Sequence, residues 1–293
     1  MTIAFRPLRN PNPLGFPGGV LPGFDPSHPA ARNCFLSAVA ANGSFISNLN
    51  GAPGSVVAGG TPALPVQAVL APPGPAVGFS LANSATKTSY ISLPLSPPNS
   101  RVVTFAAVVT PVFSGAISAQ AVACTNLTGG GGAAGLDLRL GLSGSTQTLQ
   151  IHVPGVGAFT ASSFGMLTAR SYFVFASGNS LTGAANYVML DLATGALQSG
   201  TTSTGAFTPA APAGGVVVGN YPNGGTPANE FMGYISAVHG ANQFMSLQQG
   251  VQWAADPWSF WYPRCDTVLV GVTSGGGFFA RPYYDLGARS ANV

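Results

Sequence analysis

Charged residues are the scarcest component of this sequence. Only 6% of its 293 residues are charged, against about 25% in an ordinary globular domain, and Lys87 and Glu230 are the only lysine and glutamate. Since 46% of the residues are hydrophobic, disorder driven by charge is excluded. A lone soluble monomer with so few charges would have poor colloidal stability. We therefore expect other subunits to cover much of the surface, and the alternative is a composition biased toward Ala, Gly and Pro.

The charges that do occur form no run or stripe. The net charge is +3 and the arginines are scattered along the chain, so the electrostatic footprint of a nucleic-acid-binding protein is missing. No apolar stretch approaches the roughly 18 residues that a membrane-spanning helix needs. Prolines interrupt the apolar residues near the N-terminus, which argues against a secretory signal. We predict no nucleic-acid or membrane partner, and synthesis in a bacterial cytoplasm.

Cysteines are few and far apart. The three are Cys34, Cys124 and Cys265. Their odd number argues against a disulfide framework, and the lack of a C-x-x-C spacing argues against a structural zinc site. No two acidic residues lie within a few positions of each other. We therefore predict reduced thiols, no metal and no cofactor.

Residues arranged for catalysis are also missing. A glycosidase of the usual kind needs two carboxylates flanking the bond, and Glu230 is the single glutamate. No G-x-S-x-G motif is present, so the signature of a nucleophilic serine is absent too. His28, His152 and His239 lack spaced partners, and we interpret them as structural or exposed. The prediction is that the chain is not an enzyme.

Proline is abundant in residues 1–33, and large apolar side chains are interspersed with it. Proline fixes φ and removes a backbone donor, so neither a helix nor a central strand is expected there. A solvated linker would not carry so many large apolar groups. We predict an extended arm that docks along a neighbour, the alternative being a disordered terminus. Residues 264–293, a strand and an aromatic tail, are expected to lie on a partner in the same way. The predicted contact residues of the arm and the tail are Phe5, Leu8, Leu14, Phe16, Phe24, Phe278, Phe279, Tyr283 and Tyr284.

Residues 34–263 consist mostly of short apolar runs separated by turn signals, a pattern typical of β-strands. The long β-branched run at 101–113 fits a central strand that is covered on both faces. Two alternating runs that begin near Leu136 and Gln147 predict a hairpin, with Asp137 and Arg139 on the same side as one another.

One helix is predicted, over residues 242–257. Asn242 is the expected N-cap, and Pro257 ends the helix. Gly250 falls inside it and is expected to weaken it by about 1 kcal/mol relative to alanine.

An aromatic cluster follows this helix. Trp253, Trp258, Trp261 and Tyr262 lie within ten residues of one another, and such rings can form the flat platform that a sugar needs. The alternative is that they pack the helix onto a sandwich. We favour packing, because Pro257 and Trp258 together look like a helix stop held against the core, and we keep the four residues as a candidate glycan platform.

The order of these segments matches a known pattern. VVVGNYPNGG and EFMGYISAVHG pair the motif around Gly219-Asn220 with the one around Gly233-x-Ile235, and DPWSFWYP follows the helix. In these features the chain resembles the laminin-G-like, concanavalin-A-like jelly-roll family in its tailed-phage (prophage) structural-protein form. One departure is Thr110-Pro111, where the family has a basic residue before the proline. Many relatives bind calcium through acids at the rim of the sandwich, and the scattered acids here do not fit such a site.

The resemblance implies an all-β fold: a two-sheet antiparallel jelly-roll sandwich over residues 34–263 with one short C-terminal helix, flanked by the arm (1–33) and the tail (264–293). It also implies a location in the virion. Our leading hypothesis is a non-enzymatic virion structural protein, of the capsid decoration (cement) or head-fibre type, held by its arm and tail to major capsid or tail proteins. It would form a homo-oligomer, preferably a trimer. The alternative is a tail appendage that binds a host-surface glycan or receptor, and a secreted bacterial lectin-like accessory protein is disfavoured by the missing signal.

Overall fold

The structure, a computed structural model, describes part of the chain. The described residues are 25, 27–41, 44–49, 51–57, 67–71, 74–79, 90–97, 100–112, 119–125, 136–143, 146–153, 157–161, 165–203, 206, 208, 215–220, 222–223, 226–227, 231–261, 266–267 and 282–283. In this part no helix is long and apolar enough to cross a membrane.

The larger sheet, sheet A, has nine strands. They are β1 (Cys34–Ala41), β2 (Ser44–Ser47), β4 (Gln67–Ala71), β5 (Gly74–Phe79), β7 (Val102–Pro111), β12 (Tyr172–Asn179), β13 (Ala184–Asp191), β14 (Leu197–Ser203) and β18 (Gly233–Ala241). Seven of them follow the order β14-β13-β12-β7-β18-β1-β2. Off this path, β5 pairs with β18 and with β4.

The smaller sheet, sheet B, has seven strands in the order β11-β10-β9-β8-β15-β6-β3. They are β3 (Ser55–Val57), β6 (Tyr90–Leu93), β8 (Ala119–Cys124), β9 (Asp137–Ser143), β10 (Thr146–Val153), β11 (Gly157–Thr160) and β15 (Val216–Val218). The other described elements are the 3-10 turn η2 (Pro29–Ala31), the helix α1 (Leu247–Ala255) and the two-residue strands β16 (Pro222–Asn223), β17 (Thr226–Pro227), β19 (Asp266–Thr267) and β20 (Pro282–Tyr283).

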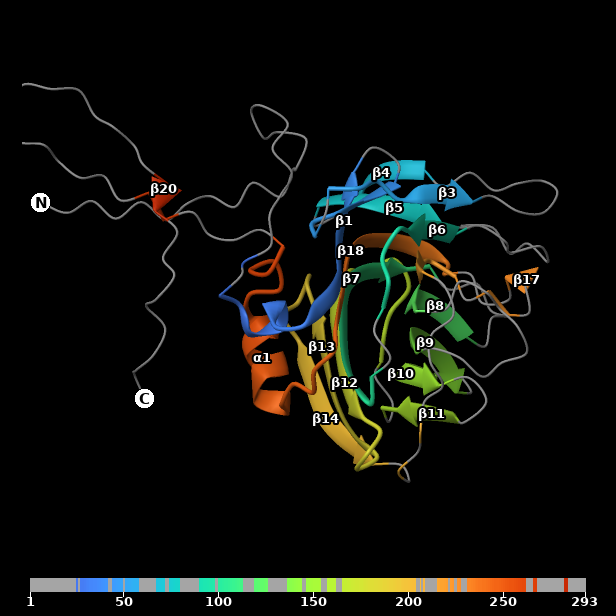
Figure 1. The fold of residues 1–293 in the computed structure, drawn as a ribbon, viewed down its shortest axis with the longest axis vertical. Helices are drawn as coiled ribbons and strands as arrows, with labels where there is room; N and C mark the ends of the chain where they lie inside the picture. Colours follow the sequence, from blue (N-terminus) through green and yellow to red (C-terminus); the bar gives the residue numbers. More distant parts are fainter. Residues whose placement is uncertain are drawn as a thin grey trace, which may run out of the picture.

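The two sheets pack face to face, and helix α1 covers the outer face of sheet A (Figure 1). A first core fills the space between the sheets, with Phe105 and Val174 from sheet A and Leu138 and Ile151 from sheet B. A second core lies between sheet A and the helix. Strand β7 is buried along almost its whole length, as its β-branched run predicts. The predicted all-β jelly-roll sandwich with one short C-terminal helix is therefore confirmed.

A β-bulge in β18 changes the expected alternation of its side chains. The register against β7 shifts between Ile235 and Ala237. As a result Ile235 and Val238 both belong to the core between the sheets, and Ala237 belongs to the core under the helix. A strict period of two would have placed Ile235 and Val238 on opposite faces.

Two glycines of the sequence motifs, Gly219 and Gly233, are required by their backbone conformation and by close contacts. Gly219 has φ +85 and Gly233 has φ +128, a region that side chains with a Cβ rarely adopt. A Cβ on Gly219 would also overlap the ring of Phe79, and one on Gly233 would overlap the backbone oxygen of Thr110. These close contacts explain physically why glycine stands at both positions.

The helix is shorter than the sequence predicts. It runs over Leu247–Ala255, and its N-cap is Ser246, which forms a capping box with Gln249. The expectation that Asn242 caps the helix is wrong, because the chain before Ser246 is not helical and is bound to sheet A. Met245 N–H donates to the Ser177 hydroxyl at 2.8 Å, so its backbone is satisfied by the sheet rather than by a helix.

Candidate functional site

Sheet B carries its charged side chains on its outward face. In β9, Leu138 and Leu140 point into the core between the sheets, so Asp137 and Arg139 point away from it. His152 stands opposite Asp137 in the antiparallel pair β9–β10. Asp137, Arg139 and His152, called here the polar cluster, thus meet at neighbouring register positions on the side of sheet B that faces away from helix α1.

The polar cluster is held together by charge-assisted contacts. Arg139 Nε donates to Asp137 Oδ2 at 2.6 Å, and His152 Nδ1 lies 3.2 Å from Asp137 Oδ1. Asp137 is fully buried and Arg139 nearly so. Taking a carboxylate out of water costs several kcal/mol unless it is paired, as Asp137 is here. The predicted placement of Asp137 and Arg139 on one side of a hairpin is confirmed.

The edge of the polar cluster is open to solvent. The His152 side chain is 25% exposed, and Gln150 and Thr160, which pair across β10 and β11, are half-buried. Gln150 Nε2 donates to Thr148 Oγ1 at 3.2 Å. A buried carboxylate that orients a partly exposed imidazole, beside an amide and a hydroxyl, can hydrogen-bond a polyhydroxylated ligand, and an Asp–His pair can also move a proton.

His152 lacks a spaced partner in the sequence, but in the structure it faces Asp137. Ser143 pairs with Thr146, and counting from that pair along both strands brings His152 opposite Asp137. The register of the two predicted strands was therefore the signal that could have found the polar cluster.

The aromatic residues after the helix pack it onto the sandwich, which is the alternative that the sequence favoured over a glycan platform. Trp253 and Trp261 are buried in the core between sheet A and the helix, and Trp258 packs against that core half-buried. Trp253 Nε1 donates to the Pro257 oxygen, and Trp261 Nε1 to the Val238 oxygen, each at 3.2 Å. This part of the prediction is corrected, because a buried ring presents no face to a sugar. The fourth residue of that candidate, Tyr262, lies outside the described residues.

The predicted arm and tail contacts fall almost entirely outside the described residues. Only Tyr283 is placed, as the backbone partner of Asp266 in the β19–β20 pair. The last residues of the predicted arm, 25–33, are described in part, and they pack on this chain itself. Phe5, Leu8, Leu14, Phe16, Phe24, Phe278, Phe279 and Tyr284 therefore stay predictions, as do the domain boundaries at 33 and 263.

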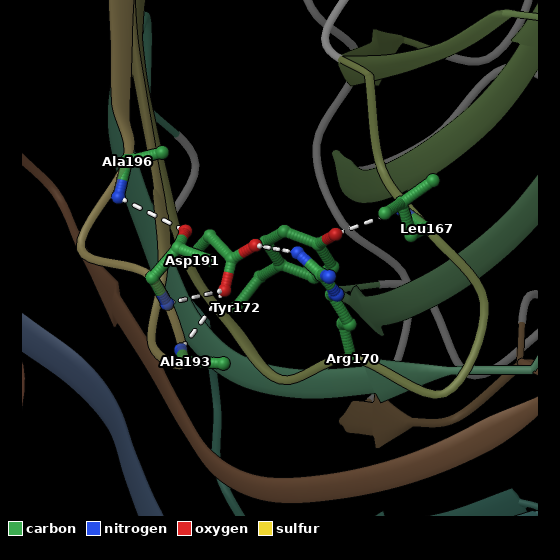
Figure 2. A network of polar contacts seen from close by, with 7 residues as sticks. Leu167, Arg170, Tyr172, Asp191, Ala193 and Ala196 are labelled. Carbon is green, nitrogen blue, oxygen red and sulfur yellow. Dashed lines mark hydrogen bonds and ion pairs between the residues drawn. The ribbon is translucent and has the colours of Figure 1, made fainter.

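A second ionic network stabilises the turn between β13 and β14 (Figure 2). Arg170 Nη1 donates to Asp191 Oδ2 at 2.9 Å, and the backbone N–H groups of Ala193 and Thr194 donate to Asp191 Oδ1. Burial alone would raise the pKa of Asp191, but these hydrogen bonds outweigh it and lower the pKa. Since Asp191 Oδ1 accepts from its own turn and Oδ2 accepts from Arg170, we assign this network to structure. In the described part of the chain, no three His, Cys, Asp or Glu side chains gather as metal ligands.

The fold resembles several solved structures at low sequence identity. No protein-family model matches the sequence. No curated protein matches it either. The enzymatically active domain of tailspike protein 2 from bacteriophage CBA120 is 15% identical, with a TM-score of 0.49 over 70% of this chain and 30% of that one. The SAP-like pentraxin of Limulus polyphemus is 13% identical, with a TM-score of 0.45 over 70% of this chain and 91% of that one. The leech intramolecular trans-sialidase is 15% identical, with a TM-score of 0.40 over 54% of this chain and 24% of that one.

These similarities concern the fold alone, and they correct one prediction. The chain spans 30% of the tailspike domain. The prediction that the chain is not an enzyme is contradicted, because chains of similar fold include an enzymatically active domain and a trans-sialidase. A count of glutamates also leaves out the Asp137–His152 pair of the polar cluster.

Proposed function

We propose that this chain is a surface-binding module of a virion appendage and that it binds a host-surface glycan at the outward face of sheet B. The observation that carries this is the polar cluster: Asp137, fully buried, orients Arg139 and the partly exposed His152. In the described residues, helix α1 covers sheet A and no helix covers sheet B. His152, whose side chain is 25% exposed, is the member of the polar cluster that a sugar can reach.

Glycan binding takes the place of capsid decoration as the preferred hypothesis. A decoration role depends on the arm and tail contacts, which lie outside the described residues. The glycan hypothesis depends on side chains that the structure does describe. The phage setting is supported by the resemblance of the motif strands around Gly219 and Gly233 and by the low charge of the chain.

The test is a glycan array probed with the full-length chain, followed by calorimetric titration of the best ligand. We expect His152→Ala and Gln150→Ala each to weaken binding by at least about tenfold, which corresponds to about 1.4 kcal/mol. Gln248→Ala, an exposed residue of helix α1 on the other side of the molecule, is the matched control and should bind as the parent does. Binding that survives His152→Ala unchanged, or an array with no ligand at all, would refute the proposal.

The same ligands also test for catalysis. The glycan that binds should be incubated with the full-length chain, and released saccharide should be measured by mass spectrometry. Turnover that is lost in His152→Ala would make His152 a catalytic residue. Binding without turnover would leave the polar cluster a binding site.

The partners of the chain are proposed as further copies of itself and other virion proteins. A chain with only 6% charged residues is better explained by a surface covered by other subunits than by a fully solvated one. Light scattering behind size exclusion should give a mass well above the 29.4 kDa of one chain, with a trimer preferred. A monodisperse monomer would remove this part of the proposal.

A further inference from the structure

The segment before strand β1 is bound to the region that follows β18. Asp25 N–H donates to the Phe260 oxygen at 2.8 Å, and Gln243 Nε2 donates to the Pro29 oxygen at 3.0 Å. Ala30 is fully buried in the core between sheet A and the helix. Residues 25–33, called here the docked segment, are therefore bound at a defined position on the sandwich.

Two histidines from different parts of the chain contact the same two aromatic rings. His28 of the docked segment has its ring centroid 4.8 Å from Trp253 and 5.5 Å from Phe260. His239 of strand β18 lies 5.1 Å from Trp253 and 4.6 Å from Phe260. The aromatic pair is thus shared by the docked segment and by sheet A.

The contacts of His28 and His239 beside Trp253 and Phe260 favour the neutral form of both imidazoles. His28 Nδ1 accepts a hydrogen bond from Ala30 N–H at 3.1 Å, an acceptor role that is lost when this nitrogen is protonated. His239 is fully buried, and its Nε2 has no hydrogen-bond partner among the described residues. Burial, together with the nearby charge of His28, lowers the pKa of His239 well below its ordinary value.

Among the described residues, the groups around His239 offer it no counter-ion. Cys34 on β1 has its Sγ 3.7 Å from His239 Nδ1, and burial raises the pKa of this thiol to about 12, so that it stays uncharged. The docked segment carries Asp25 and Arg32, and Asp256 caps the end of α1. Asp25 accepts hydrogen bonds from its own turn, and neither carboxylate forms an ion pair with His239 in the described residues.

We propose that His28 and His239 form a pH-sensitive latch that holds the docked segment on the sandwich at neutral pH and releases it in acid. Release exposes imidazoles that bind a proton at about pH 6.5, whereas docking excludes that proton from the buried ring. Each pH unit below about 6.5 should therefore favour release by up to about tenfold through His239. Acid would free the N-terminal part of the chain without unfolding the sheets.

Hydrogen exchange of the full-length chain tests the latch. Peptides covering 25–33 and strand β7 should be followed at about pH 7.5 and about pH 5.0, with exchange times corrected for the intrinsic effect of pH on amide exchange. We expect the protection of 25–33 to fall at least about tenfold relative to β7. Constant protection of 25–33, or an equal loss in β7, would overturn the proposal.

Variants assign the effect to the two rings. His239→Phe keeps an aromatic ring without a titratable group, and His28→Asn keeps a side-chain acceptor for Ala30 N–H; each should flatten the pH dependence of protection in 25–33. His152→Asn on sheet B is the control and should keep the parental pH dependence. A slope that is unchanged in both latch variants would show that other groups are responsible. If a variant does not fold, the comparison of 25–33 with β7 in the parent chain still decides the matter.

Discussion

Gly250 of helix α1 lies directly against the ring of Phe175 on strand β12. A Cβ added at Gly250 would stand 2.6 Å from Phe175 Cε1 and 3.0 Å from Val188 Cγ2. The glycine that weakens the helix by its propensity is therefore the residue that lets the helix approach sheet A. Helix propensity favours alanine at this position, whereas the close packing against sheet A requires glycine, and the packing requirement is the one that the sequence meets.

Gly250→Ala should consequently destabilise the protein. A gain of about 1 kcal/mol in helix propensity is set against overpacking, which typically costs about 1–3 kcal/mol. We expect a lower midpoint of urea unfolding. Gln252→Ala, at an exposed position of the same helix, should be neutral or slightly stabilising. A Gly250→Ala protein more stable than the parent would mean that helix and sheet are not in close contact.

The helix start can be tested with two substitutions. Ser246 accepts from Gln249 N–H at 3.2 Å, and the Gln249 side chain accepts from Ser246 N–H at 2.9 Å. Ser246→Ala should lower the free energy of unfolding by about 0.5–2 kcal/mol. Asn242→Ala should have a smaller effect, because the Asn242 side chain caps nothing. Urea unfolding of both variants measures the difference, and the reverse order would restore Asn242 as the cap.

The Asp191 turn should contribute to stability in a pH-dependent way. The pKa of Asp191 is lowered in the folded protein, so its stabilising effect is present above its ordinary value of 3.8 and is lost as the pH falls through the folded pKa. Arg170→Ala should raise that pKa and reduce the loss of stability in acid (Figure 2). Thermal unfolding from neutral pH down to about pH 3 measures this. An acid dependence identical to that of the parent would show that Arg170 does not hold the carboxylate.

Much of the sandwich could be predicted from the sequence, because its strands follow short-range patterns. The β-branched run of β7 and the hairpin of β9 and β10 depend on side-chain type and turn residues alone. The bulge at Ile235 and the start of the helix at Ser246 could not be predicted this way. Both depend on partners distant in sequence: Pro111 to Thr104 for the bulge, and Ser177 for the chain that enters the helix.

The candidate site was predicted only in part for the same reason. Asp137 and Arg139 are two residues apart on one strand, so period two places them together. His152 joins them only through the exact register of the hairpin, and His239 meets His28 only after the whole chain has folded. Packing of the aromatic cluster against the sandwich was favoured from the sequence, because Pro257 and Trp258 directly follow the helix. The contacts of Trp253 and Trp261 depend on the docking of α1 and of the residues after it on sheet A.

The Asp137–Arg139 pair allows stability to be separated from ligand binding. Asp137→Ala removes the buried carboxylate that faces Arg139 and His152, and loss of one partner of a buried pair typically costs about 3–5 kcal/mol. The double variant Asp137→Val with Arg139→Leu removes both charges and should recover most of that loss, since apolar replacement of a buried pair is often neutral. Urea unfolding measures both variants.

Glycan titration of the double variant then decides the role of the pair. If the stable double variant no longer binds the ligand of the parent chain, the pair orients His152 for binding. If it binds as the parent does, Asp137 and Arg139 serve the fold alone and the site must lie elsewhere on the sandwich. Gln248→Ala, which leaves sheet B untouched, sets the reference for both measurements.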